Sequence, residues 1–244
     1  DWRVRDALVH AFTFEFINET MTGSAPPRIT SYWSNSPLGM EGGPAAGRVA
    51  EFLEPFADDL IPGTMEGYAL PVSDGSERNR AGSAKAFEML EAAGWTVQDG
   101  ALRDADGNEF ELEILLDQGA TEMQSIIALY MESLSRIGIS PVMTVADSAQ
   151  FKERTDAYDF DMVYYRRGLS LSPGKEQYNY YGSEFANEVG GRNLMGVQSA
   201  AADAMIGRLL TSESQDDFVA AVKALERVLT AGRYVIPIYQ WNVS

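Results

Sequence analysis

Residues 110–164 read FELEILLDQGATEMQSIIALYMESLSRIGISPVMTVADSAQFKERTDAYDFDMVY, and this stretch decides the fold class. Short apolar runs alternate in it with longer segments whose apolar residues recur at helical spacing. The pattern predicts strands over residues 110–116, 140–145 and 160–164 and helices over 121–137 and 149–155. Because strands that alternate with helices typically pair in parallel and are covered by those helices, the stretch predicts an α/β domain with a partly parallel sheet.

The chain before this stretch combines helices with long polar loops. Apolar positions at helical spacing predict a helix over residues 4–17. Four prolines and many Gly, Ser and Asn residues predict an ordered loop over 23–47. A helix is predicted again over 48–60, and a second loop over 62–75. Long loops in a compact domain commonly cover a surface or shape a site.

Cap-forming and turn-forming residues predict where the next two elements begin and end. Ser76 is the predicted N-cap of a helix that ends before Gly94. The dipeptide Asp99-Gly100 then predicts a short β-hairpin with a type I′ turn, because both central residues of that turn need positive φ angles. A local antiparallel pair is therefore expected beside the parallel strands.

The last third of the chain is irregular at first and helical afterwards. Residues 168–193 are rich in aromatic and turn-forming residues and predict an irregular segment. Helices are predicted near residues 201–210 and over 217–230, and a final strand over 235–241. No internal repeat or low-complexity tract is present in the sequence. We therefore predict one α/β domain that comprises residues 1–244.

The composition excludes several classes of protein. The 244 residues include 19 Lys and Arg against 36 Asp and Glu, which gives a formal net charge of −17. So acidic a surface repels phosphate backbones and anionic lipid, so we expect no nucleic-acid partner. The sequence has no cysteine, which excludes disulfides and thiolate chemistry. Its apolar runs are also far shorter than the roughly 20 residues that a membrane span needs.

The sequence carries no convincing catalytic motif. The run GLSLS over residues 168–172 is close to the G-x-S-x-G pattern of serine hydrolases but lacks the last glycine. The sole histidine, His10, is predicted to lie within a helix, where we expect a surface or internally bonded side chain. A Ser-His-Asp triad is therefore not predicted.

No metal or cofactor site is expected either. One histidine and no cysteine make a transition-metal site improbable. Asp104 to Asn108 look like part of a calcium loop, but the glycine and closing glutamate fall at the wrong positions, so we interpret them as a hairpin turn. No phosphate-binding G-x-x-x-x-G-K-[ST] motif occurs.

The segment that follows the strand over 160–164 is the candidate binding site. In open α/β sheets, ligands bind beyond the carboxyl ends of the strands. This segment supplies an aromatic face, two guanidinium groups that suit carboxylates, and hydroxyl and amide groups that can bond to a ligand's amides. The candidate ligand-binding residues are Tyr165, Arg166, Arg167, Ser170, Ser172, Gln177 and Asn193. Alternatively, the two adjacent arginines pair with nearby acids and have no binding role.

Six short motifs, in order over nearly the whole chain, resemble the extracellular solute-binding proteins of oligopeptide and dipeptide ABC importers. They are WRVRDAL at residues 2–8, AGW at 93–95, the join of Leu134 with IGI at 137–139, DFDM at 159–162, SLSPGKEQ at 170–177, and Asn193 followed by Gly196, Asp203 and Ile206. The fifth motif, with YGS at 181–183, resembles one peptide-type branch in particular. Each motif is weak alone, and their shared order makes the resemblance specific.

The resemblance implies an architecture and a setting. The fold would be one lobe of a type II periplasmic binding protein, a three-layer lobe with a mixed, partly parallel sheet flanked by helices. The chain would be the carboxyl-side lobe, with the first lobe and the signal peptide absent from this fragment. Such proteins are periplasmic, are expected to be monomers without a cofactor, and deliver solutes to an ABC permease in the inner membrane.

One departure from the family concerns ligand recognition. Oligopeptide binders commonly have an aspartate in the loop after the "DM" strand that holds the peptide's α-amino group. Counting from Asp161, the nearest equivalent here is Ser170, and an arginine stands where an aromatic residue is expected. The ligand is therefore expected to be peptide-like, with its carboxylate at Arg166 or Arg167 as an alternative to amino-terminal recognition.

Three hypotheses from different classes follow. The first is a non-enzymatic binding protein that captures peptide-like solutes in a cleft between two lobes for an ABC importer. The second is a hydrolase that uses two carboxylates, since 36 acidic residues allow many pairs. The third is a ligand-sensing domain of a signalling protein. Turnover of the ligand distinguishes the second from the first, and the remaining gene sequence distinguishes the third.

Overall fold

The computed structural model describes residues 1–239, which group into two compact units. Unit 1 consists of Asp1–Arg28, Pro71–Arg166 and the described residues from Ile238 onward. Unit 2 consists of Ile29–Leu70 and Arg167–Pro237. Each unit has its own set of buried apolar residues. The prediction that residues 1–244 form one domain stays a prediction.

A three-stranded parallel sheet forms the centre of unit 1. Its strands are β3 (Glu111–Asp117), β4 (Ser140–Ala146) and β5 (Met162–Val163), and β3 lies between the other two. In the register, Ile114 of β3 lies opposite both Met143 of β4 and Met162 of β5. The parallel strands predicted from residues 110–164 are confirmed, with β5 shorter than expected.

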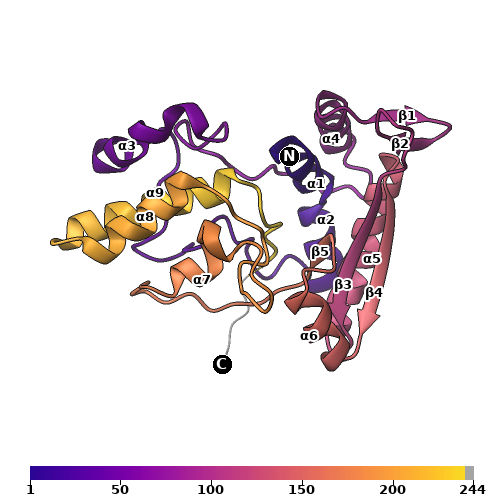
Figure 1. Cartoon of the computed structure of the whole chain (residues 1–244). Helices are drawn as coiled ribbons and strands as arrows, with labels where there is room; N and C mark the ends of the chain where they lie inside the picture. Colours follow the sequence, from indigo (N-terminus) through magenta and orange to yellow (C-terminus); the bar gives the residue numbers. More distant parts are fainter. Residues whose placement is uncertain (240–244) are drawn as a thin grey trace. The chain divides into compact units, whose positions relative to one another are not determined.

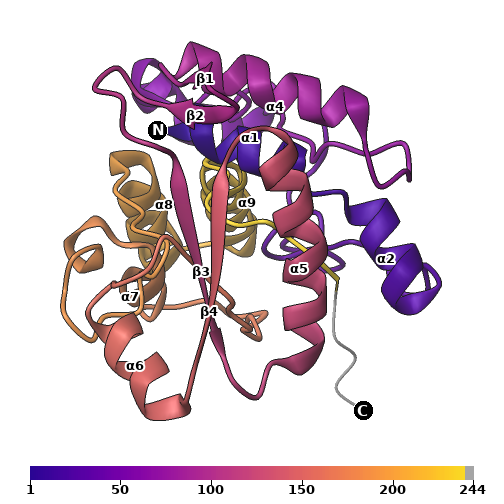
Figure 2. The same ribbon diagram turned by 90° about the vertical axis from the view of Figure 1, so that its right-hand side faces the viewer.

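Helix α5 (Thr121–Arg136) runs along the β3–β4 pair (Figure 2) and supplies much of the core of unit 1. Its buried face consists of Met123, Ile126, Ile127, Tyr130, Ser133 and Leu134. The central strand β3 is buried at Leu112, Ile114, Leu115 and Leu116. The hydroxyl of Tyr130 donates a hydrogen bond to the backbone C=O of Leu8 at 2.8 Å, which ties α5 to the N-terminal helix. Helix α6 (Ser148–Asp156) follows β4 and contacts β3 and β4.

Two helices, α1 (Trp2–Ala11) and α2 (Phe14–Thr22), replace the single helix predicted over residues 4–17. The backbone is extended at Phe12, which ends α1. Phe12 and Phe14 are both buried, although residues two apart in a continuous helix face different directions. The break therefore allows both rings into the core, where Phe12 packs edge-on against Tyr130 with the ring centroids 5.1 Å apart.

Helix α4 (Arg80–Ala92) packs against α1 and begins later than predicted. Its N-cap is Asn79 rather than Ser76, and the Asn79 side chain accepts a hydrogen bond from the backbone N–H of Gly82 at 3.4 Å. Ser76 caps the preceding turn instead, because its hydroxyl accepts the backbone N–H of Asn79 at 3.1 Å. The helix ends before Gly94 as predicted, where φ is +97°.

Strands β1 (Thr96–Gln98) and β2 (Ala101–Arg103) form the predicted antiparallel hairpin. Asp99 and Gly100 have φ angles of +52° and +86°, as a type I′ turn requires. The predicted combination of parallel and antiparallel strands flanked by helices is therefore confirmed, although the antiparallel pair forms a separate two-stranded sheet.

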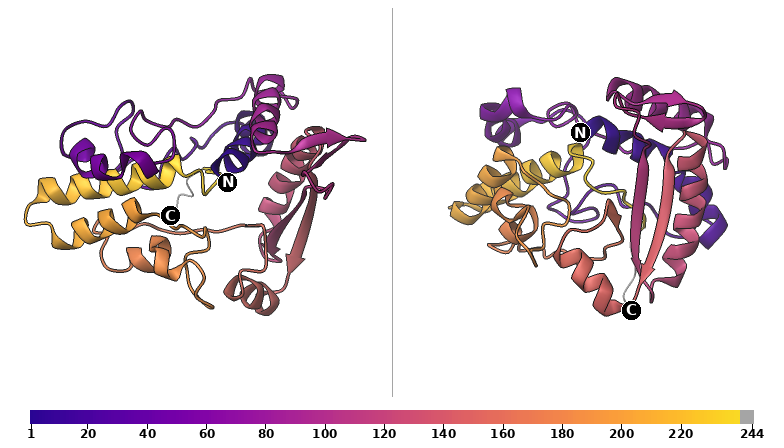
Figure 3. Two further views of the ribbon diagram at one scale, coloured as in Figure 1. Left: turned by 45° about the horizontal axis from the view of Figure 1, so that its top comes forward. Right: turned by 45° about the vertical axis from the view of Figure 1, so that its right-hand side comes forward.

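Unit 2 consists of helices and long loops. No β-strand lies within residues 29–70 or 167–237. Its helices are α3 (Gly47–Leu53), the 3₁₀ helix η1 (Glu54–Asp59), α7 (Gln177–Tyr181), the 3₁₀ helix η2 (Ser183–Phe185), α8 (Ala200–Thr211) and α9 (Gln215–Ala231). Helices α8 and α9 pack side by side (Figure 1), and α3 lies along α9 (Figure 3). The short helix α7 interrupts the segment predicted to be irregular.

The core of unit 2 lies where α9 meets α8 and α3. Val222, Leu225 and Leu229 of α9 are fully buried, and Phe218 of the same helix packs against them partly buried. Met205 and Ile206 of α8 are equally buried in the same cluster. Each such side chain contributes about 1.5–3 kcal/mol when it is removed from water.

A buried carboxylate on α9 holds the loop that precedes α3. Glu226 is 0% exposed and accepts the backbone N–H of Trp33 at 2.5 Å and the backbone N–H of Met40. Burial raises the pKa of the Glu226 carboxyl, although hydrogen bonds from Ser31, Trp33 and Met40 act in the opposite direction. The backbone N–H groups of this loop are thus hydrogen-bonded to a helix side chain rather than to a neighbouring strand.

Two arginines hold the chain on either side of α3 and η1 through its carbonyl groups. Arg227 donates to the backbone C=O groups of Thr64, Glu41 and Gly43 at 3.2, 2.9 and 2.7 Å. Arg233 donates to the backbone C=O of Pro62 at 2.6 Å. A guanidinium with five N–H donors can satisfy several carbonyls at once, which suits it to a loop without secondary structure.

The end of the described chain differs from the prediction. A strand was expected over residues 235–241, but 235–238 form no strand and Tyr239 makes only an isolated antiparallel bridge with Arg28. Residues 240 and 241 lie outside the described part of the chain. No helix within residues 1–239 is long and apolar enough to cross a membrane.

Replacement of Gly138 by alanine should destabilise unit 1 more than the same change at Gly94. Both glycines have left-handed φ angles, +87° and +97°, which cost an L-residue about 1–2 kcal/mol. A Cβ on Gly138 would also lie 3.1 Å from the backbone N of Leu102, whereas one on Gly94 would meet nothing within 4 Å. Urea unfolding of both variants measures the difference, and equal losses of unfolding free energy would show that this contact is relaxed easily.

Replacement of Glu226 by alanine should lower the unfolding free energy by about 2–4 kcal/mol, because two buried backbone donors lose their acceptor. Asp216→Ala on the same helix is the control. Asp216 is exposed in the first turn of α9, so its loss should cost at most about 1 kcal/mol. Chemical denaturation gives both values, and a loss at Glu226 no larger than at Asp216 would contradict the proposed anchoring of the loop.

Candidate functional site

The predicted binding residues are divided between the two units. Tyr165 and Arg166 end the Pro71–Arg166 part of unit 1, and Arg167 begins the Arg167–Pro237 part of unit 2. Ser170, Ser172, Gln177 and Asn193 all belong to unit 2.

In unit 1 the candidate residues follow directly after strand β5. The backbone N–H of Tyr164 still bonds to the C=O of Leu115 at 3.2 Å, and the chain then leaves the sheet. Tyr165 is 51% exposed and Arg166 is exposed as well. Their position beyond the carboxyl end of a parallel strand agrees with the prediction from the sequence.

Two acidic residues near β5 form ion pairs with an arginine of α6. Arg154 of α6 makes a forked contact with Glu113 at 2.9 and 2.7 Å and also bonds to Asp159 at 2.8 Å. The hydrogen bonds from Arg154 are the main reason that the pKa of Glu113 is lowered. The Asp161 carboxylate accepts the backbone N–H of Glu113 at 2.8 Å. This network fixes β5 against β3 and thereby the point at which the candidate segment begins.

In unit 2, Arg167 lies against aromatic rings. Its guanidinium carbon is 3.1 Å from the centroid of the Tyr180 ring, and its Nη1 donates to the Tyr181 hydroxyl at 3.2 Å. Arg167 makes no ion pair with a carboxylate among residues 1–239. The cation–π contact holds the guanidinium in place while its remaining N–H groups stay unbonded within the described chain.

Further aromatic and basic side chains surround this contact. Arg192 donates to the Tyr180 hydroxyl at 3.0 Å, and the Tyr32 ring packs edge-on against Tyr181 with centroids 5.7 Å apart. We call Arg167, Tyr180, Tyr181, Arg192 and Tyr32 the arginine–tyrosine cluster. Four of its members were not among the predicted residues. The run QYNYY at 177–181 was an available signal for two of them, whereas the distant Tyr32 gave none.

Ser170 and Ser172 form a turn that is attached to the core of unit 2. The Ser170 hydroxyl accepts the backbone N–H of Ser172 at 3.0 Å. The Ser170 backbone C=O accepts the indole N–H of Trp33 at 3.0 Å, and Trp33 is 2% exposed. Both serines are exposed, so a buried indole fixes the backbone of a segment whose side chains face solvent.

Gln177 is buried at the start of α7. Its side chain is 1% exposed, and its Nε2 donates to the Glu176 carboxylate at 2.8 Å. The backbone N–H of Gly174 bonds to the same carboxylate oxygen at 2.9 Å. The Gln177 Oε1 is buried and makes no hydrogen bond.

Asn193 has a structural role in this arrangement. It is 0% exposed, and its side-chain NH₂ donates to the backbone C=O groups of Gly182 and Val197 at 3.0 and 2.9 Å. Its side-chain oxygen accepts the backbone N–H of Val197 at 2.9 Å. The amide thus joins the end of α7 to the chain that leads into α8.

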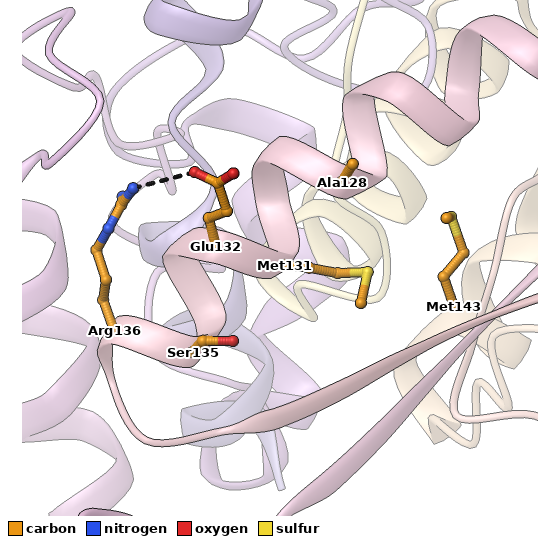
Figure 4. A pocket seen from close by; sticks show the side chains of 6 residues that line it. All are labelled: Ala128, Met131, Glu132, Ser135, Arg136 and Met143. Atoms are coloured by element: carbon orange, nitrogen blue, oxygen red, sulfur yellow. Dashed lines mark hydrogen bonds and ion pairs between the residues drawn. The ribbon is translucent and has the colours of Figure 1, made fainter.

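Two hollows lie on unit 1, and neither is lined by a predicted residue. A groove of about 590 Å³ between α5 and β4 is lined by Ala128, Met131, Glu132, Ser135, Arg136 and Met143 (Figure 4). A second hollow is lined by Arg78, Arg80, Ser83 and Arg136. Among the described residues, no group of three or more His, Cys, Asp or Glu side chains could hold a metal ion.

The chemistry of the candidate segment suits recognition of a ligand. Guanidinium N–H groups bind carboxylate and carbonyl oxygens, and tyrosine rings provide flat apolar faces. These groups lie on a segment whose backbone is fixed by Trp33 and Asn193. Such an arrangement can bind a solute that carries amide and carboxylate groups.

Comparison with known proteins gives consistent matches. Residues 1–188 match the family model of bacterial extracellular solute-binding proteins, family 5 middle. A putative binding protein of Brucella melitensis is 38% identical over 246 residues, which cover 99% of this chain and 40% of that protein. The peptidoglycan-binding protein YepA of Agrobacterium fabrum is 36% identical over 249 residues, with the same coverage of 99% and 40%.

A solved structure has the same fold. The oligopeptide-binding protein AppA of Bacillus subtilis, solved in complex with a nonapeptide, matches with a TM-score of 0.72 and 20% identity, covering 98% of this chain and 41% of that one. At this identity the likeness concerns the fold, and it confirms the predicted fold class. The chain spans about two fifths of the length of the curated relatives it matches.

Replacement of Asn193 by alanine should lower the unfolding free energy of unit 2 by about 2–4 kcal/mol, because three buried backbone groups lose their partner. Asn179→Ala provides the control, since Asn179 is exposed on α7. It should change stability by less than about 0.5 kcal/mol. Denaturation monitored by tryptophan fluorescence compares the two, and a small effect at Asn193 would refute its structural role.

Proposed function

The chain belongs to family 5 of the bacterial extracellular solute-binding proteins, and on that premise we propose that it is part of the substrate-binding component of an ABC importer for peptide-like solutes. The observation that carries the proposal is the exposed segment after β5, where Arg167 is stacked on Tyr180 with N–H groups to spare. This segment lies within the residues that match the family.

Peptide-like ligands are supported by the names of similar proteins. YepA is a peptidoglycan-binding protein, another relative from Agrobacterium fabrum is a probable peptide-binding protein, and AppA was solved with a nonapeptide. Peptides and peptidoglycan stems share backbone amides and free carboxylates. The guanidinium of Arg167 is suited to bind the carboxylates and the carbonyl oxygens of such amides.

The chain provides one wall of the binding cleft in this proposal. It corresponds to the carboxyl-side lobe of a two-lobe protein, and the other lobe comes from the part of the full-length protein that the relatives contain beyond the match. The lobes close over the ligand about a hinge, as in other periplasmic binding proteins. In the proposal, Tyr165, Arg166, Arg167, Ser170 and Ser172 contribute side chains to ligand binding, and the buried Gln177 and Asn193 support the segment that carries the last three.

The protein acts in this proposal without chemical change to its ligand. Members of the family and their structural neighbours are binding proteins, and the family is periplasmic or extracellular. The full-length protein therefore captures its solute outside the cytoplasm as a monomer and passes it to an ABC permease in the inner membrane. No cofactor takes part.

The first test is a thermal-shift screen of the full-length protein against peptides, muropeptide fragments and unrelated small solutes. A ligand that binds only the folded state stabilises it by about 2.7 kcal/mol at a concentration one hundred times its Kd. Selective shifts by peptide-like compounds that are recovered intact are expected. A screen without any shift would refute the peptide assignment, and a hit recovered in cleaved form would refute the non-enzymatic one.

The same screen is then repeated on the double variant Arg166→Ala/Arg167→Ala. Its affinity for the best ligand, measured by calorimetry, should fall at least tenfold, because hydrogen bonds to charged groups contribute about 1.5–3 kcal/mol each. Arg103→Ala is the control, since Arg103 lies in the β1–β2 hairpin and pairs with Glu109. Unchanged affinity in the double variant would remove both arginines from the site.

A further inference from the structure

Three arginines line one hollow of unit 1, where α4 begins and α5 ends. The hollow has a volume of about 430 Å³ and is lined by Arg78, Arg80, Ser83 and Arg136. This volume falls within the roughly 300–1,000 Å³ that binding sites for small molecules occupy. None of the residues predicted to bind a peptide-like solute lines it. The hollow therefore lies outside the proposed function.

Hydrogen bonds hold Arg136 beside the start of α4. Its Nη1 donates to the backbone C=O of Glu77 at 2.7 Å. Its Nη2 pairs with the carboxylates of Glu77 and Glu132, and Figure 4 shows the contact with Glu132. Because Glu77 directly precedes Arg78 in the chain, these bonds bring the end of α5 to the segment that carries the first arginine of the hollow.

The other two guanidinium groups have no partner. Within residues 1–239, neither the Arg78 nor the Arg80 side chain makes a hydrogen bond or an ion pair. Both residues are exposed. Arg80 is also the first residue of α4, where a positive charge faces the positive end of the helix dipole and lowers stability. The stability of the fold therefore accounts for neither charge.

A buried amide fixes the backbone between these two arginines. Asn79 is 5% exposed. Its side-chain NH₂ donates to the backbone C=O of His10 at 3.5 Å, and its side-chain oxygen accepts the backbone N–H of Gly82 at 3.4 Å. The backbone that carries Arg78 and Arg80 is thus held in place before a ligand binds, which reduces the conformational entropy that binding costs.

The charges at the hollow favour an anion, although the whole chain carries a net charge of −17. Three guanidiniums line the hollow and two carboxylates pair with one of them, which leaves a local positive charge. Charges more than about 8 Å away are largely screened at physiological ionic strength, so the local surplus decides. A phosphate group carries about −1.5 to −2 charge at pH 7 and has three acceptor oxygens. A single planar carboxylate is satisfied by one guanidinium fork, whereas phosphate can accept from several.

We propose that the hollow between the start of α4 and the end of α5 binds a phosphate group. Arg78 and Arg80 donate to its oxygens, and Arg136 contributes the N–H groups that Glu77 and Glu132 leave unbonded. The group is either a free phosphate or the phosphate of a lipid headgroup, since both offer the same oxygens. The site is independent of the proposed function and needs no peptide-like ligand.

The test is calorimetry of the full-length protein with inorganic phosphate at neutral pH and constant ionic strength. The wild type should show saturable binding. In Arg78→Gln/Arg80→Gln the affinity should fall about tenfold or more, because charge-assisted hydrogen bonds are lost. The control Lys85→Ala/Lys152→Ala removes as many positive charges and should bind like the wild type. Both lysines are exposed, pair with acidic residues and lie outside the hollow.

Co-sedimentation with phosphatidylglycerol vesicles, compared with phosphatidylcholine vesicles, distinguishes a lipid headgroup from free phosphate. Binding to the anionic vesicles that only the double arginine variant loses supports the site with a lipid as its source, even where inorganic phosphate does not bind. The proposal is overturned if neither probe binds the wild type, if the arginine variant binds as tightly, or if the lysine variant loses as much affinity. The peptide screen is a separate measurement, so either proposal can fail while the other stands.

Discussion

The arrangement of unit 2 depends on two adjacent charged residues that are buried on one helix. Glu226 accepts backbone N–H groups of the loop that precedes α3, and Arg227 donates to backbone C=O groups of the chain on either side of α3 and η1. A segment without strands cannot satisfy its own backbone in the interior. These two side chains take the place of a sheet, and the apolar face of α9 packs against the loops that they hold.

The same constraint extends to the candidate site. Glu226 holds the backbone of Trp33, and the Trp33 indole holds the backbone of Ser170. Asn193 fixes the other end of the segment. In the proposed function, a fixed backbone allows Arg167 to present its guanidinium with little loss of conformational freedom on binding, which is how preorganisation contributes to affinity. Glu226 on α9 then affects ligand binding without contacting the ligand.

Local sequence patterns predicted most of the elements but not their ends. The strands and helices of residues 110–164 and the Asp99-Gly100 turn were confirmed, because periodicity and turn chemistry act over a few residues. The single helix over 4–17 was wrong, since the burial of both Phe12 and Phe14 requires a break. The Ser76 cap was wrong because Asn79, only three residues later, supplies the cap instead. In both cases the end of a helix depends on tertiary packing or on another capping residue nearby, which the periodicity of the sequence does not record.

The sequence by itself determined the α/β fold class and most of the order of the elements, and it predicted the segment after β5 as the place for a site. Only the tertiary structure decided which polar side chains of that segment are used to hold the fold. Asn193 and Arg167 are both polar in the sequence, yet the Asn193 side chain is hydrogen-bonded to the backbone of Gly182 and Val197, whereas Arg167 is stacked on Tyr180. The reason is physical: a pattern records the periodicity of neighbours along the chain, whereas hydrogen-bond saturation depends on which groups the fold brings within bonding distance.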